Sequence, residues 1–112
     1  MNIRQGEVRF IPVQDFGTHE TRHLEAQDGV YIVGESESHH HHVLDVEGVT
    51  VLERARAPAG MRILHAIVER PTTLRQTACN AHAAHTIEPG LYEIRIKREF
   101  NPFLEQARRV AD

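Results

Sequence analysis

The sequence predicts a single all-β domain, a small jelly-roll-like β-sandwich or barrel that ends in a short C-terminal helix. Short segments rich in β-branched residues alternate with turns that contain glycine or proline, which is typical of small sandwiches and barrels. A length of 112 residues fits one domain with one modest core. The apolar period becomes helical only near the end, where Asn101 is a good N-cap and Pro102 suits the first helical position. We therefore assign residues 1–112 to one domain, with the helix at about 101–110.

The N-terminal segments predict one strand followed by a loop. Residues 5–13 carry apolar side chains alternating with charge, but Pro12 cannot donate a hydrogen bond to a ladder. We expect an edge strand or the frayed end of a strand there. Residues 14–28 are polar and predict a long loop, with a turn of helix around Glu20–Ala26.

Glycine marks the next two turns. Asp28-Gly29 is a strong turn signal, and it leads into an apolar strand at Val30–Val33. Gly48 permits a turn within residues 43–53, so this segment predicts a hairpin or a bent strand pair.

Residues 61–68 are apolar on both faces, which is typical of a central strand that is buried on both sides. His65 lies in the middle of this strand, and we expect a core histidine with a satisfied ring. A further strand is expected at residues 72–77, directly after Pro71.

The clearest strand pattern follows Pro89-Gly90. Side chains alternate along residues 91–99, so Tyr92, Ile94 and Ile96 share the face that we expect to be buried. The opposite face and the apolar side of the terminal helix are candidates for an interface. The interface residues are Glu93, Arg95, Lys97, Glu99, Phe103 and Leu104.

Nine histidines are the unusual feature of the composition, and four of them are consecutive. Because side chains alternate along a strand, His40 and His42 would share one face. His82 and His85 would be neighbours in one turn of helix. Imidazole ligands suit zinc and other transition metals, so these four histidines form a candidate metal site. The alternative, which predicts no bound cofactor, is a surface strip that gains positive charge below about pH 6.5.

Composition and charge exclude several classes of function. A net charge of −3 without a basic block argues against nucleic acid as the main partner. The sequence has no apolar run long enough to cross a bilayer and no signal-peptide pattern, so we expect neither a membrane partner nor secretion by a signal peptide. The single cysteine, Cys79, rules out an internal disulfide. There is no Gly-x-Ser-x-Gly elbow and no phosphate-binding glycine loop, which favours a non-enzymatic role.

One spacing in the histidine stretch has a known counterpart. It consists of Gly34, His40-x-His42 and Glu47. This spacing resembles the first motif of the cupin family, in which two histidines and a glutamate bind a metal inside a β-barrel. The second cupin motif, a Pro-x-Gly followed by a ligand histidine, is absent. The resemblance implies a metal-binding, cupin-like protein.

Three short phrases stand in order along most of the chain. They are Gln5-Gly6-Glu7-Val8, Gly34-Glu35 with His40-x-His42, and Pro89-Gly90-x-Tyr92-Glu93-Ile94-Arg95 with Arg98-Glu99-Phe100. Together they are similar to a group of small, mostly uncharacterised proteins from phages, prophages and bacterial genomes. The resemblance implies a phage or prophage origin.

From these observations we expect a non-enzymatic structural or binding module, such as a protein that decorates or cements a capsid. The expected partners are further copies of the chain, in a homo-oligomer such as a trimer, and a capsid protein. The expected location is the virion or the host cytoplasm. Charges of both signs along the strand at 91–99 would fix the register of a partner. The alternative function is a metal-binding, cupin-like protein that uses the histidines.

Overall fold

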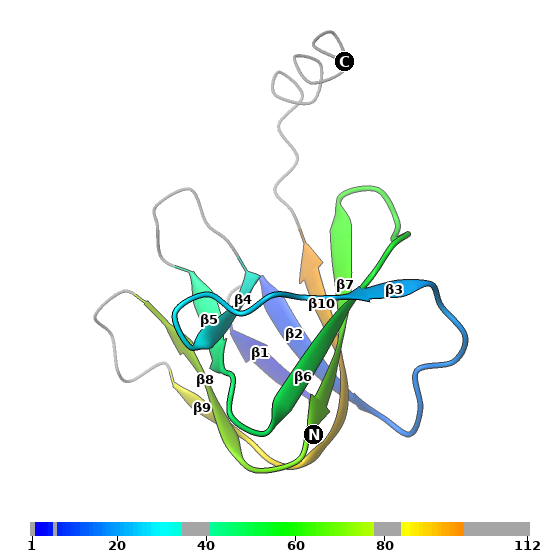
Figure 1. Ribbon diagram of the computed structural model, residues 1–112. Coiled ribbons are helices and arrows are strands. Elements are labelled where there is room, and N and C mark those ends of the chain that lie inside the picture. Colours follow the sequence, from blue (N-terminus) through cyan, green and yellow to red (C-terminus); the bar gives the residue numbers. More distant parts are fainter. Residues whose placement is uncertain (1, 6, 35–40, 78–83, 98–112) are drawn as a thin grey trace, which may run out of the picture.

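The computed structural model describes residues 2–5, 7–34, 41–77 and 84–97, which form two antiparallel sheets packed face to face (Figure 1). The predicted all-β fold is therefore confirmed, and of the predicted sandwich or barrel the described residues form two sheets. The predicted helix at about 101–110 lies outside the described residues. Within the described ranges, no helix is long and apolar enough to cross a membrane.

Ten strands make up the two sheets. The six-stranded sheet contains, in spatial order, β1 (Ile3–Gln5), β2 (Val8–Val13), β10 (Gly90–Lys97), β7 (Met61–Val68), β6 (Val49–Arg54) and β3 (Thr21–His23). The four-stranded sheet contains β4 (Val30–Gly34), β5 (His42–Asp45), β8 (Thr72–Gln76) and β9 (His85–Ile87).

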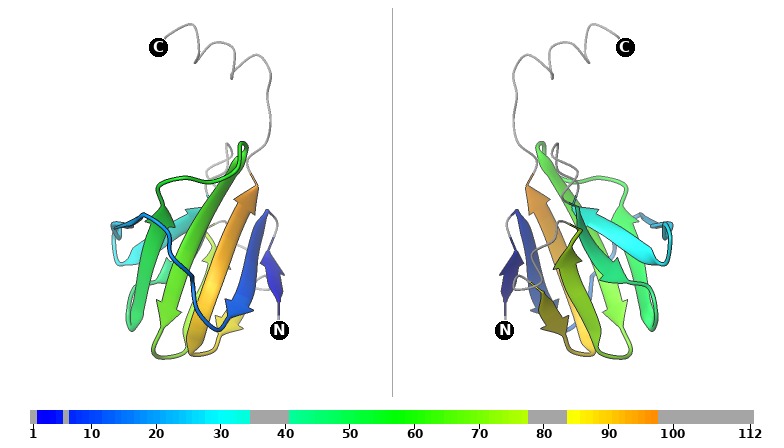
Figure 2. Two further views of the ribbon diagram at one scale, coloured as in Figure 1. Left: turned by 90° about the vertical axis from the view of Figure 1, so that its right-hand side faces the viewer. Right: turned by 90° about the vertical axis from the view of Figure 1, so that its left-hand side faces the viewer.

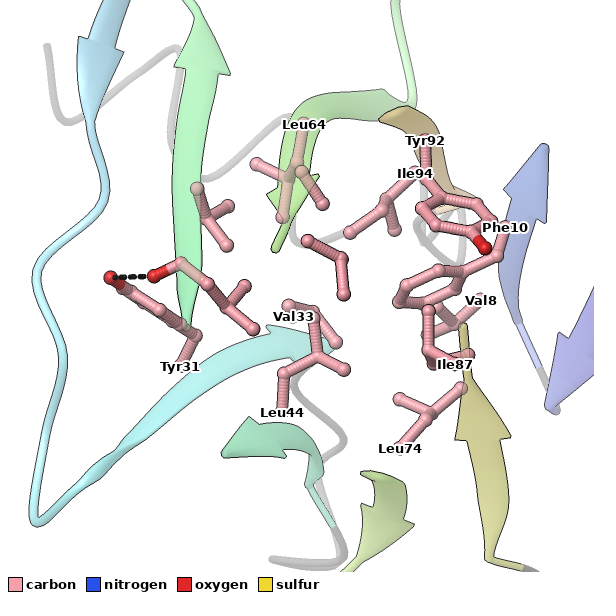
Figure 3. Packing of buried hydrophobic residues seen from close by; sticks show 14 of the residues in the cluster. Val8, Phe10, Tyr31, Val33, Leu44, Leu64, Leu74, Ile87, Tyr92 and Ile94 are labelled. Carbon is pink, nitrogen blue, oxygen red and sulfur yellow. Dashed lines mark hydrogen bonds between the residues drawn. The ribbon is translucent and has the colours of Figure 1, made fainter. Parts of the chain in front are cut away.

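The hydrophobic core lies between the sheets and takes side chains from both (Figure 3). Phe10 and Ile94 of the six-stranded sheet and Leu44 of the four-stranded sheet are fully buried. Burial of each such side chain stabilises the fold by about 1.5–3 kcal/mol. The hydroxyl of Tyr31 donates a hydrogen bond to the carbonyl oxygen of Val49 at 3.0 Å, so the polar end of this buried ring is satisfied.

Strand β10 has the alternation that the sequence predicts. Tyr92, Ile94 and Ile96 are buried, whereas Arg95 and Lys97 are exposed. The strand lies between β2 and β7 and is paired with both along most of its length. Strand β7 is buried on both faces, again as predicted.

The turn of helix expected around Glu20–Ala26 is not formed, and strand β3 occupies this position. β3 pairs with β6, and two flanking backbone bonds extend the contact: Leu24 N–H to the Val51 oxygen and Ala55 N–H to the Glu20 oxygen, both 2.9 Å. The polar segment has no apolar helical face, so pairing with an available sheet edge determines its structure.

Residues 43–53 do not form a hairpin. β5 pairs with β4 and β8, whereas β6 pairs with β7 and β3. The chain passes from one sheet to the other at a tight turn, in which Val49 N–H donates to the Val46 oxygen at 3.1 Å and Gly48 has a φ of 70°. This route lets both Leu44 and Val49 face the core.

The predicted N-terminal strand is divided into β1 and β2. Although β2 lies inside the sheet, β1 pairs only with Val8–Phe10, so Pro12 has a strand partner on the β10 side alone. This explains how a residue without an N–H is accommodated. The predicted Asp28-Gly29 turn is confirmed by φ angles of 51° and 79°, as a two-residue hairpin turn requires.

The assignment of faces on β10 can be tested by two neighbouring substitutions. Ile94→Ala should lower the free energy of unfolding by about 2–5 kcal/mol, because it removes buried methyl groups and leaves a cavity. Arg95→Ala removes a side chain that is 44% exposed and should cost far less. Urea denaturation of both variants measures the difference; a larger loss for Arg95→Ala would contradict the fold.

Candidate functional site

Inward-facing polar residues gather at one end of the sandwich. At this end β4 finishes at Gly34, β5 begins at His42, β8 finishes at Gln76 and β9 begins at His85. His42 lies directly opposite both Gly34 and Gln76 in the four-stranded sheet. We call this the histidine end.

A local irregularity in β4 shapes the histidine end. The pairing of β4 with β5 shifts between Ile32 and Gly34, so Val33 is an extra residue, and both Val33 and Gly34 are buried. A Cβ atom at Gly34 would lie 2.6 Å from Cγ2 of Val8 and 3.1 Å from Cδ2 of His42. Only glycine therefore allows the two sheets and the imidazole to approach this closely.

His42 is buried and held by a hydrogen bond across the sandwich. Its Nδ1 lies 2.7 Å from Oε1 of Gln5, which is also buried. An amide oxygen only accepts, so Nδ1 carries the proton and Nε2 carries the lone pair. Burial lowers the pKa of His42; the Glu7 carboxylate opposes this shift, and His41 adds to it. The ring is therefore neutral at neutral pH, the form that binds metals.

His85 lies on the same face of β9 as the core residue Ile87, and it is half-buried. It stands opposite Leu74 of β8, whereas His42 stands opposite Gln76 on the other side of that strand. His42 and His85 are separated by two strand spacings across the sheet and by two residues along it. Their α-carbons are therefore about 12 Å apart. A ligand between the rings, rather than a direct hydrogen bond, would connect them.

The structure therefore places two of the four predicted metal ligands. His42 and His85 lie on the inward face of the same sheet, and His85 is in a strand rather than in the expected turn of helix. His40 and His82 lie outside the described residues. The described part of the chain contains no cluster of three histidine, cysteine or acidic side chains that could hold a metal.

Two backbone-linked contacts join the segments on either side of the site. Thr77 N–H donates to the oxygen of His41 at 2.9 Å, and His41 N–H donates to Oγ1 of Thr77 at 3.0 Å. The start of β5 and the end of β8 are therefore fixed to each other.

Sequence reasoning did not identify Gln5 as part of the site. Gln5 is 37 residues away from His42 in the sequence, and no local pattern around it indicates a buried amide. The contact depends on the packing of β1 and β2 against the four-stranded sheet.

His65 has a different environment, on the outer face of the six-stranded sheet. The connection between β2 and β3 crosses this face (Figure 2), and the ring of Phe16 stacks on His65 with centroids 4.3 Å apart. Nε of Arg54 donates to Nε2 of His65 at 2.8 Å. The pKa of His65 is lowered by burial and then by Arg54 and His19, while Glu93 raises it. His65 is buried and its ring is satisfied, as predicted, but the predicted placement in the core is wrong, because the ring lies outside the cluster between the sheets.

The predicted interface on β10 is partly occupied by internal ion pairs. Glu93 accepts hydrogen bonds from Arg54 at 2.5 Å and from Arg95 at 2.8 Å, and its side chain is only 12% exposed. Arg95 and Lys97 are exposed and remain accessible to a partner. The other predicted interface residues, Glu99, Phe103 and Leu104, lie outside the described residues.

Comparison with known proteins identifies a family. The model of a domain of unknown function, DUF8820, matches residues 4–97. The match covers most of the chain, which therefore belongs to that family. No curated protein and no solved structure matches the chain significantly.

The two buried histidines predict a pH dependence of stability. Both have a pKa below the ordinary value of 6.5, so the unfolded chain binds more protons than the folded chain just below pH 6.5. The free energy of unfolding should therefore be highest above pH 6.5 and should fall as the pH drops toward the lowered pKa values. Denaturation at a series of pH values measures this.

The variant that tests this combines His42→Gln with His65→Gln, and its pH profile should be flatter than that of the wild type. Replacing the exposed His23 by Gln is the matched control. An equally steep profile in the double variant would show that other groups cause the acid sensitivity.

Proposed function

We propose that this member of the DUF8820 family is a non-enzymatic, metal-binding module that holds a transition-metal ion such as Zn²⁺ at the histidine end. The observation that supports the proposal is the buried, neutral imidazole of His42, with Nδ1 bonded to Gln5 and with no described residue hydrogen-bonded to Nε2. Metal-binding histidines usually donate their second ring nitrogen to an oxygen in this way, which fixes the tautomer and the ring orientation.

His42 and His85 are the proposed ligands on the described strands. Their shared inward face and half-buried to buried setting favour a site with limited access to water. The sequence adds His40, which is two residues before His42, as expected for a shared strand face. His82 stays in the proposal only as a predicted ligand, because its spacing from His85 assumed a turn of helix and His85 begins a strand. Four nitrogen ligands would suit a closed tetrahedral zinc site, which has no open position for a substrate. This is why we propose binding rather than catalysis.

Metal retention after dialysis tests the proposal. The wild type, loaded with Zn²⁺ at pH 7.5 and dialysed, should retain about one ion per chain, because preformed ligands release metal slowly. His42→Gln and His85→Gln should each reduce the retained zinc to near zero by elemental analysis, with circular dichroism confirming the fold. His23→Gln is the matched control for loss of an exposed histidine.

Zinc retention that is unchanged in both site variants would contradict the proposal, as would a wild type that retains none. Retention should also weaken below about pH 6, because protons compete for the imidazoles.

The second candidate is the structural role that the sequence resemblance implies, decoration of a phage capsid by an oligomer such as a trimer. Exposed Lys97 and the half-exposed Arg95, which also donates to Glu93, favour it, because both lie on the outward face of β10. Cofractionation with virions and the mass in solution test this role. A metal-free monomer that does not sediment with particles would contradict it.

A further inference from the structure

Three arginines lie in one row across the outer face of the six-stranded sheet. The strand register places Arg4 of β1 directly opposite Arg9 of β2, and Arg9 directly opposite Arg95 of β10. All three residues are exposed. We call them the arginine row.

The direction of these side chains follows from their neighbours. Arg9 lies between Val8 and Phe10, both of which are fully buried in the core, so Arg9 projects outward. Arg95 lies between Ile94 and Ile96 and projects the same way. The arginine row therefore stands on the surface that faces away from the four-stranded sheet.

The connection between β2 and β3 contacts the outer face of the sheet beside the arginine row and not on it. Phe16 of this connection stacks on His65, which pairs with Glu93 of β10. Glu93 is two residues before Arg95, so this anchor lies in the neighbouring row of the sheet.

Like charges that face each other directly on adjacent strands destabilise a sheet. Arg95 is partly compensated by Glu93, whose Oε2 accepts from its Nε at 2.8 Å. Among the residues that the structure describes, no acidic side chain forms an ion pair with Arg9. Arg9 stands opposite an arginine on each side, and its own guanidinium has no ion pair within the described ranges, which points to a ligand that supplies negative charge at Arg9.

We propose that the arginine row is a docking surface for an acidic segment of a protein partner. Guanidinium groups form paired hydrogen bonds with carboxylates, which gives both affinity and orientation. The whole chain has a net charge of −3, so it would repel a long polyanion, whereas a short acidic segment would experience mainly the local positive charge. This favours an acidic protein over nucleic acid.

The proposal is independent of the metal site. The arginine row is on the outer face of the six-stranded sheet, whereas His42 and His85 face the interior on the other sheet. Loss of one function should therefore leave the other intact. The arginine row also gives the second candidate function a partner chemistry.

Binding of a fluorescent decaglutamate peptide at low salt tests the docking surface. The wild type should bind it, and the affinity should fall as salt is added. Arg9→Gln combined with Arg95→Gln should weaken binding at least about tenfold. The matched control is Arg22→Gln combined with Arg56→Gln, which changes the net charge by the same amount at exposed positions outside the arginine row. This control should have little effect on the affinity for the peptide.

Equal weakening by both double variants would show an effect of net charge alone and would overturn the proposal. Absence of binding by the wild type would also overturn it. The proposed class of partner would be wrong if the wild type bound a single-stranded DNA oligomer more tightly than decaglutamate and the Arg9→Gln, Arg95→Gln variant lost that binding.

Stability provides a readout that needs no ligand. Arg9→Gln should raise the melting temperature at low salt, because it relieves repulsion within the arginine row, and the gain should vanish at high salt. A lower melting temperature at low salt would show that Arg9 is stabilised within the chain and would contradict the proposal.

Discussion

The central position of β10 between β2 and β7 is the constraint on which the rest of the structure depends. Its register aligns Ile94 with Phe10 on one side and with Leu64 on the other, so three fully buried side chains from distant parts of the sequence form one layer of the core. The same register sets the outer face. It brings Arg95 beside Arg9 and places Glu93 opposite His65, where Arg54 donates to both. Both surfaces of this sheet therefore follow from one set of strand pairings.

The histidine end depends on how closely the two sheets approach. The extra residue at Val33 and the missing side chain at Gly34 bring β4 against Val8, and this brings His42 within hydrogen-bonding distance of Gln5. A buried polar pair costs stability unless both partners are satisfied, and here the amide oxygen and the ring N–H satisfy each other. Among the described residues nothing is hydrogen-bonded to Nε2 of His42, which distinguishes this ring from that of His65, whose Nε2 accepts from Arg54.

Local patterns in the sequence predicted much of the fold. Alternation identified the buried face of β10, and the apolar run at residues 61–68 identified a strand that is covered on both sides. The patterns failed where distant partners decide the structure. β3 is too polar and too short to be recognised, and it forms because β6 offers an edge. For the same reason the sequence did not identify Gln5 and Arg54 as partners of histidines. Gln5 contacts His42, and Arg54 contacts His65, only once the strands have paired and packed. The histidine spacing predicted a shared face but could not show which face is inward.

The protonation of His42 in the metal-free protein tests the account of the histidine end most directly. Two-bond ¹⁵N–¹H correlation spectra at neutral pH distinguish the two neutral tautomers of a histidine ring and the charged form. The structure predicts a neutral ring with the proton on Nδ1, held by Gln5, and a change to a mixture of tautomers in Gln5→Leu. A proton on Nε2 in the wild type, or a charged ring at pH 7, would contradict the account, because the nitrogen proposed to bind metal would then be blocked.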